Sequence, residues 1–155
     1  VLVLDQIQDP HNLGALIRTA AACGFDAVVL PRHGAAPVTP AVERAATGAV
    51  HDVAICRVPN ISRALEIFKR HDLWSIGLAP RSGQNLFEID LPDRVAIVLG
   101  GETGLRPLVA RTCDMRVGIP IHPQIDSLNA SVAGAVAMYE VVRRGKLDRV
   151  RGRWY

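Results

Sequence analysis

The stretch IHPQIDSLNASVAGAVAMYEVVRR runs from Ile121 to Arg144 and joins a polar segment to an apolar one. Its second half is apolar with helical spacing, so we expect a helix from about residue 128 to 144. Its first half brings three small hydrogen-bonding residues to the start of that helix, where free backbone N–H groups gather. Ser127, Asn129 and Ser131 therefore suit a polar ligand.

Two further features of the same stretch concern the helix itself. Asp126 or Ser127 is suited to the N-cap position, because a short side chain can accept hydrogen bonds from the first turn. Small residues recur along one face of the helix, which predicts that another helix packs very close there. They are Ala130, Ala133, Gly134 and Ala137.

Strand-like and helix-like runs alternate along the rest of the chain. The apolar, strand-like runs are 1–5, 27–31, 52–58, 73–79, 94–100 and 115–119. The helix-like runs are 13–23, 40–46, 63–71 and 106–112, with Asn60 or Ser62 as the cap of the third. Continuous apolar strands separated by helices predict an α/β fold, in which a mostly parallel sheet is covered by helices on both faces.

Ligands of such sheets bind at the carboxyl ends of the strands, where the loops gather. This rule selects three segments: QIQDPHNLGA at 6–15, GGETGLRP at 100–107 and IPIHPQIDSLN at 119–129. The glycine-rich segment matches neither GxGxxG nor the P-loop pattern, so a phosphate-binding role is weakly supported. Glu102 is harder to explain as a plain turn residue, whereas Arg18 and His11 could be ordinary solvated residues.

Composition narrows the function classes. The 155 residues suit one domain, and the net charge of +3 permits an acidic partner such as RNA. Aromatic residues make up only 5%, which argues against a base-stacking platform. Cys23, Cys56 and Cys113 form no CxxC pair, which argues against zinc and disulfides and favours the cytoplasm. No apolar run is long enough to span a membrane.

The three selected segments together resemble the three motifs of the SpoU (TrmH-like) family of RNA 2′-O-ribose methyltransferases, within the SPOUT superfamily. The motifs here read DPHNLGALIRTAAACGFDAVVLP, VAIVLGGETGLRPLV and IPIHPQIDSLNASVAGAVAMYEVVR. The resemblance extends from Val1 to about Arg144, and SLNASVA in particular is similar to the bacterial branch that modifies a 23S rRNA guanosine.

The resemblance implies properties that the strand pattern cannot show. It implies a deep C-terminal trefoil knot, an S-adenosylmethionine pocket at the knot, no metal, and a homodimer whose active site uses both subunits. It also implies that residues 1–155 form the catalytic domain. The N-terminal RNA-binding domain that many relatives carry is absent from this chain, and we expect an excised domain because the chain opens within a strand.

Site residues follow from the resemblance position by position. The implied catalytic residues are Arg18, Asn12, Glu102, Ser127 and Asn129. The implied cofactor-binding residues are Leu78, Ala79, Leu99, Gly100, Gly101, Gly104, Ile119, Pro120, Ile121, Leu128, Asn129 and Ser131. Arg18 would orient the ribose or phosphate and stabilise alkoxide charge, because a guanidinium is essentially never deprotonated.

Several alternatives stay open. The family usually has two residues between the glutamate and the next glycine of its second motif, whereas here only Thr103 separates Glu102 from Gly104. The chain could therefore be a catalytically weak RNA-binding member of the fold, or its substrate could be tRNA. An unrelated doubly wound enzyme that uses a nucleotide cofactor is the third class.

Overall fold

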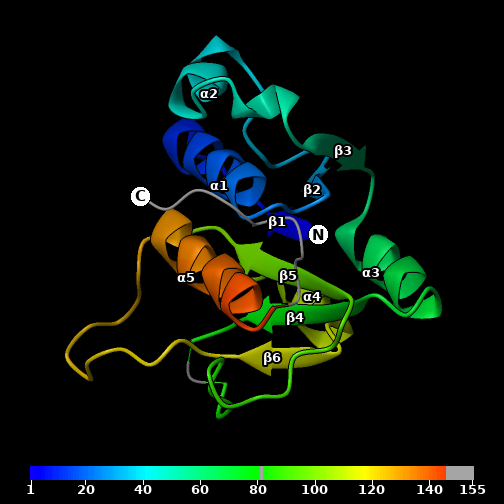
Figure 1. Ribbon diagram of the computed structural model, residues 1–155, viewed down its shortest axis with the longest axis vertical. Coiled ribbons are helices and arrows are strands. Elements are labelled where there is room, and N and C mark those ends of the chain that lie inside the picture. Colours follow the sequence, from blue (N-terminus) through cyan, green and yellow to red (C-terminus); the bar gives the residue numbers. More distant parts are fainter. Residues whose placement is uncertain (81, 146–155) are drawn as a thin grey trace.

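The computed structural model describes residues 1–80 and 82–145, and it contains one sheet of six strands, all parallel. The strand order across the sheet is β3-β2-β1-β5-β4-β6 (Figure 1). The strands are β1 (Leu2–Asp5), β2 (Ala27–Pro31), β3 (Ala54–Val58), β4 (Trp74–Leu78), β5 (Val95–Gly100) and β6 (Met115–Val117). Each lies within or at a predicted strand, so the predicted α/β class and parallel sheet are confirmed.

Helices cover both faces of this sheet, as predicted (Figure 1). One face carries α1 (Pro10–Ala22) and α5 (Ala130–Arg143), with α2 (Pro40–Ala45) packed on the outside of α1. The other face carries α3 (Ile61–Arg70) and α4 (Pro107–Thr112). A short 3₁₀ helix, η1 (Ala49–His51), was not predicted, since three residues are too few to show a period.

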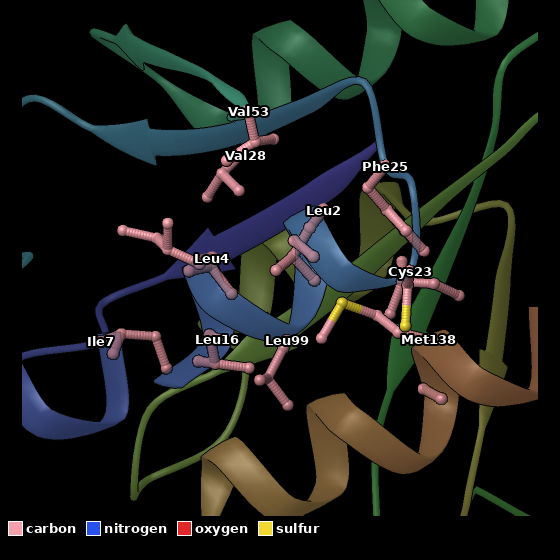
Figure 2. Close-up of a cluster of buried hydrophobic side chains, with 14 of the residues drawn as sticks. Leu2, Leu4, Ile7, Leu16, Cys23, Phe25, Val28, Val53, Leu99 and Met138 are labelled. Carbon is pink, nitrogen blue, oxygen red and sulfur yellow. The ribbon is translucent and has the colours of Figure 1, made fainter. Parts of the chain in front are cut away.

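Alternation along the strands builds two separate cores. Leu2 and Leu4 of β1 join the core beneath α1 and α5, whereas Val3 between them joins the core beneath α3 and α4. Figure 2 shows the larger core, in which Leu16 of α1 and Leu99 of β5 lie between the sheet and α5. Full burial of one such leucine stabilises the fold by roughly 1.5–3 kcal/mol, so both faces hold the strands in register.

The first helix begins earlier than predicted. Its apolar spacing starts at Leu13, but the helix starts at Pro10, because the Asp9 carboxylate accepts hydrogen bonds from the backbone N–H groups of His11 (3.1 Å) and Asn12 (3.2 Å). Proline suits the first helical position, where its missing N–H costs nothing. The cap therefore places Asn12 in the first turn, at the carboxyl edge of the sheet.

The predicted start of the last helix is wrong. Asn129, rather than Asp126 or Ser127, is the N-cap of α5, and its side-chain oxygen accepts from the backbone N–H groups of Ser131 (2.8 Å) and Val132 (3.4 Å). Residues 118–129 contain no helix, so this segment can cross the ends of the strands. Composition could not show this, because all three residues are good caps.

The small-residue face of α5 packs against a helix, as predicted, and that helix is α1. A Cβ atom placed on Gly134 would lie 2.3 Å from Leu16 Cδ2 and 3.1 Å from Leu99 Cδ2. Gly14 of α1 permits an equally close approach on its other side, since a Cβ there would lie 2.4 Å from Ala45 Cβ of α2. Gly14 and Gly134 therefore allow the close packing of three neighbouring helices, α2, α1 and α5.

Candidate functional site

A cavity of about 440 Å³ opens at the carboxyl ends of β4, β5 and β6. Its apolar base is formed where these strands end, at Leu78, Leu99 and Val117. All three predicted segments contribute to it. The predicted site residues that line it are Asn12, Leu78, Ala79, Leu99, Gly100, Gly101, Glu102, Gly104, Ile119, Ile121, Ser127, Leu128 and Asn129.

Three predicted site residues do not line this cavity: Pro120, Ser131 and Arg18. Eight further lining residues were not selected: Pro80, Val117, His122, Pro123, Ile125, Asp126, Ala130 and Ala133. Most of the eight lie within or beside the segment 119–129, which sequence reasoning chose as a ligand loop. The signal that could have found them is the late start of α5, because the non-helical segment before it passes along the cavity and places most of its residues in the lining.

One wall of the cavity is a tight turn from Gly101 to Gly104. The backbone N–H of Gly104 donates to the carbonyl of Gly101 (2.9 Å), and Gly104 has φ +79°, a conformation that favours glycine. Glu102 and Thr103 are the two central residues of this turn. The single residue between Glu102 and Gly104 thus closes a hydrogen-bonded turn, and Glu102 still faces the cavity.

A buried ion pair fastens this turn to the end of β1. Asp5 is fully buried, and its carboxylate accepts from the backbone N–H of Arg106 (2.9 Å) and from the Arg106 guanidinium (2.7 and 2.8 Å). The backbone carbonyl of Asp5 also accepts from the N–H of Gly101 (3.0 Å). A buried carboxylate with this many donors holds its neighbours in one geometry, so it fastens the loop after β5 to the end of β1.

The N-cap of α5 fixes the opposite wall. The Asn129 side-chain oxygen accepts from the hydroxyl of Ser131 (2.6 Å) as well as from two backbone N–H groups. Ser131 is therefore committed to the cap and does not reach the cavity. The Asn129 oxygen is committed too, which leaves its amide NH₂ to face a ligand.

Arg18 stands apart from this constellation in the single chain. It lies on the exposed face of α1 and forms no hydrogen bond or ion pair with another of the described residues. Asn12, six residues or about one and two-thirds turns earlier on the same helix, does line the cavity. The structure therefore brings together four of the five predicted catalytic residues and leaves Arg18 facing outward.

The cysteines offer no nucleophile in the interior. Burial raises the pKa of the Cys23 thiol to about 11, and burial followed by the charges of Asp114 and Asp5 raises the pKa of Cys113 to about 12. Both thiols stay protonated near neutral pH and are poor nucleophiles. Neither Cys23 nor Cys113 lines the cavity.

Two features are absent from the described part of the chain: a cluster of metal ligands and a membrane-spanning helix. No group of three or more His, Cys, Asp or Glu side chains is placed to hold a metal ion within residues 1–80 and 82–145. None of the helices in that part of the chain has the length and apolar character needed to cross a membrane.

Comparison with known proteins gives consistent matches. The model of the SpoU rRNA Methylase family matches residues 1–139. A 23S rRNA (guanosine-2′-O-)-methyltransferase of Xanthomonas axonopodis pv. citri is 43% identical over 145 residues, which cover 93% of this chain and 58% of that protein. The chain thus spans less than two thirds of the length of this curated relative.

Solved structures match over the same region. The SpoU methyltransferase AviRb from Streptomyces viridochromogenes, in complex with the cofactor AdoMet, superposes with a TM-score of 0.86 at 27% identity, over 93% of this chain and 59% of that one. An AdoMet-bound rRNA methyltransferase from Sinorhizobium meliloti gives a TM-score of 0.84 at 26% identity, over 92% and 55% of the two chains.

Proposed function

This chain belongs to the SpoU rRNA methylase family, and from that premise we propose that it transfers a methyl group from S-adenosylmethionine to the 2′-hydroxyl of a ribose in structured RNA. A guanosine of 23S rRNA is the proposed acceptor, after the named activity of the curated relative. The observation that carries the proposal is the cavity in which all three family motifs meet, with Asn12, Glu102, Ser127 and Asn129 around it.

The cavity fits the proposed cofactor in size and chemistry. Its volume of about 440 Å³ lies in the range of small-molecule sites, which combine apolar walls with a few placed polar groups. Leu78, Ile119 and Leu128 would hold the cofactor mainly through their main-chain groups. Gly100 keeps the end of β5 in close contact with the turn that forms the cavity wall, because a Cβ atom there would lie 2.1–2.3 Å from backbone atoms of Gly104 and Leu105.

When bound, S-adenosylmethionine supplies a methyl carbon activated by the adjacent sulfonium charge. The ribose 2′-oxygen forms the new C–O bond as the S–C bond breaks, and the hydroxyl proton is released, so the products are methylated RNA, S-adenosylhomocysteine and H⁺. Asn12 and Glu102 position the nucleotide, and Ser127 and Asn129 order the pocket. Arg18 stabilises the negative charge that develops on the 2′-oxygen.

A homodimer accounts for the position of Arg18. In the single chain this residue faces outward and does not line the cavity. In the proposed dimer, the face of α1 that carries Arg18 lies against the partner, and each arginine serves the partner's cavity. The exposed apolar residues Val132 and Tyr139 of α5, seven residues apart on one helical face, supply a surface for that contact.

We also infer that the chain is knotted. β6 lies at one edge of the sheet, yet α5 packs on α1 and β5, so residues 118–129 run back across the carboxyl ends of the intervening strands. In the proposed trefoil this segment passes through the preceding loop, contrary to the usual rule against knots. Such threading would explain why the same segment lines so much of the cavity.

Calorimetric titration is the first test of this function. We expect micromolar binding of S-adenosylmethionine and S-adenosylhomocysteine and no binding of ATP or NAD. Binding of ATP or NAD instead would identify an unrelated nucleotide-dependent enzyme. Mapping of ribose methylation in rRNA and tRNA from a deletion strain then identifies the acceptor, and a tRNA site would replace 23S rRNA in the proposal.

The catalytically weak alternative is less well supported, because the shortened turn still presents Glu102 to the cavity. Single-turnover methylation separates the two, since a quiet RNA-binding protein would bind the cofactor without transferring its methyl group. We place the activity in the cytoplasm, in agreement with three cysteines that form no disulfide.

A further inference from the structure

A second, smaller hollow of about 210 Å³ lies beside the cofactor cavity, at the carboxyl ends of β1 and β5. The strand order reverses between these two strands, which is where ligands of open parallel sheets bind. The two hollows share four lining residues: Asn12, Gly101, Glu102 and Ala130. A molecule in the second hollow would therefore meet the cofactor across the side chains of Asn12 and Glu102.

The remaining lining residues are mostly polar and uncharged. Gln6, Gln8 and Thr103 line the second hollow but not the first, and none of their side chains hydrogen-bonds to another of the described residues. The carboxylate of Asp9, by contrast, is occupied in capping α1. The hollow thus offers two carboxamides and a hydroxyl, groups that both donate and accept hydrogen bonds.

Of the residues that line this hollow, only Gln6 has a positive φ. It has φ +62°, in the left-handed region, where a side chain costs roughly 1–2 kcal/mol and glycine costs little. The conformation is imposed from both sides, because a Cβ on Gly101 would lie 2.4 Å from the Gln6 carbonyl oxygen, and the adjacent Asp5 is locked to Arg106. A non-glycine residue held in this conformation at a site is an indication of function.

We infer that this second hollow binds the acceptor nucleoside, and that Gln6 and Gln8 hydrogen-bond to the edge of its base; this rests on the proposed methyl transfer. A base edge presents neighbouring donors and acceptors that a carboxamide can match, and proteins read RNA mainly at unpaired bases. A nucleoside placed here has its ribose toward Asn12 and Glu102, the residues that face both hollows.

Two variants of the full chain test the inference. Gln6→Gly removes the carboxamide at a backbone conformation that glycine accepts without strain, and Gln8→Ala removes the second one. Thr47→Gly is the matched control, because Thr47 also has a left-handed backbone (φ +50°) and lines neither hollow. The first readout is the affinity for unmodified 23S rRNA transcribed in vitro, measured in the presence of S-adenosylhomocysteine. The second is the RNA concentration that half-saturates single-turnover methylation. The third is the affinity for S-adenosylmethionine, measured by calorimetry.

We expect each variant to weaken RNA binding and to raise the half-saturating concentration by about two- to tenfold, as for the loss of one hydrogen bond. Cofactor affinity and thermal stability should not fall, and Thr47→Gly should leave both RNA readouts unchanged. If the wild-type protein methylates RNA but both glutamine variants bind RNA as tightly as it does, the inference is overturned and the proposed function stands. A wild type that neither binds the cofactor nor methylates RNA would overturn the proposed function as well.

Discussion

At the scale of single residues, Arg18 is exposed and yet is proposed to act in catalysis, so its role in stability and its role in activity can be separated. It lies on the outer face of α1 without a partner among the described residues, so Arg18→Ala should change the free energy of unfolding by less than about 0.5 kcal/mol. The rate constant of single-turnover methylation should nevertheless fall by roughly a hundredfold or more, as for the removal of one preorganised donor.

The matched variant Arg18→Lys should not restore turnover, because a point charge cannot reproduce the planar fork of the guanidinium. Calorimetry should show nearly constant cofactor affinity in both variants, since Arg18 does not line the cofactor cavity of its own chain. Turnover near that of the wild type in Arg18→Ala would remove the assignment and leave Asn12 and Glu102 as candidates.

Gly100, in the wall of the cofactor cavity, has no space for a side chain. A Cβ atom there would lie 2.1–2.3 Å from backbone atoms of Gly104 and Leu105, and backbone cannot turn aside as a side chain can. Gly100→Ala should therefore displace the turn that forms the cavity wall. We expect calorimetric titration to show at least about a tenfold loss of cofactor affinity, which is only about 1.4 kcal/mol.

Gly48→Ala is the control for this prediction. Gly48 has φ +84° and open space around its Cβ position, so alanine there introduces backbone strain without a clash and away from the cavity. Its cofactor affinity should match that of the wild type. Equal affinity in Gly100→Ala would show that the wall of the cavity tolerates the shift.

At the scale of elements, continuous apolar runs separated by helix-like runs predicted the strands and the two-faced sheet, because β1, β2 and β5 are buried along nearly their whole length. Helix starts were harder to predict, since hydrogen bonding rather than apolar spacing sets them. Asp9 moves the start of α1 back to Pro10, and Asn129 delays that of α5 to Ala130.

The C-terminal end of α5 is held by a partly buried charge cluster. Glu140 accepts hydrogen bonds from Arg143 (2.7 and 2.8 Å) and Arg144 (2.6 Å), and Arg144 also donates to the carbonyls of Phe87 and Ile89. The hydrogen bonds from Arg143, followed by those from Arg144, outweigh the opposing effect of burial and lower the pKa of Glu140 from 4.5 to about 2.

This shift gives a pH dependence of known sign. A lowered pKa in the folded state adds stability that is fully present above pH 4.5 and is lost as the pH falls from 4.5 towards 2. In urea unfolding, the difference in stability between wild type and Glu140→Gln should shrink over that window. A constant difference would show that the cluster does not hold the helix end. Taking the difference removes the contribution of other carboxyls, such as Asp114.

At the scale of the whole molecule, the site depends on the order of the strands, which the sequence pattern does not determine. Alternating strands and helices predict that loops gather at one edge, but not that β1 lies beside β5, or that β6 lies at the edge next to β4. That order brings Asn12, Glu102 and Ser127 to one cavity from segments about 90 and 25 residues apart. The carboxyl-end rule selected the three loops, and only the family resemblance placed them around one cofactor pocket.

The second hollow escaped prediction for a related reason. Gln6 and Gln8 lie in a segment that was selected as a ligand loop, yet neither was singled out, because glutamine has no strong preference that marks it as functional. The informative features are the left-handed backbone of Gln6 and the carbonyl pressed against Gly101, and both exist only once β1 and β5 are paired.

Whether one active site draws on two chains can be tested by mixing variants. Arg18→Ala keeps the cofactor cavity and loses the arginine. Gly100→Val adds a branched side chain where even a Cβ atom would lie 2.1 Å from backbone, so it keeps the arginine and should abolish cofactor binding. If Arg18 serves the partner's cavity, a mixed dimer contains one complete site, in which the cavity of the first variant meets the arginine of the second. Each variant alone should be nearly inactive.

An equal mixture of the two, after subunit exchange, should recover about a quarter of wild-type methylation, because about half of the dimers are mixed and each holds one complete site. If Arg18 acts within its own chain, no dimer in the mixture contains a complete site, and the mixture stays as inactive as its components.

Tyr139→Glu places a charge on the exposed apolar face of α5 and should yield monomers by light scattering. Introduced into both variants, it should abolish the recovery, whereas recovery in monomers would exclude the two-chain site.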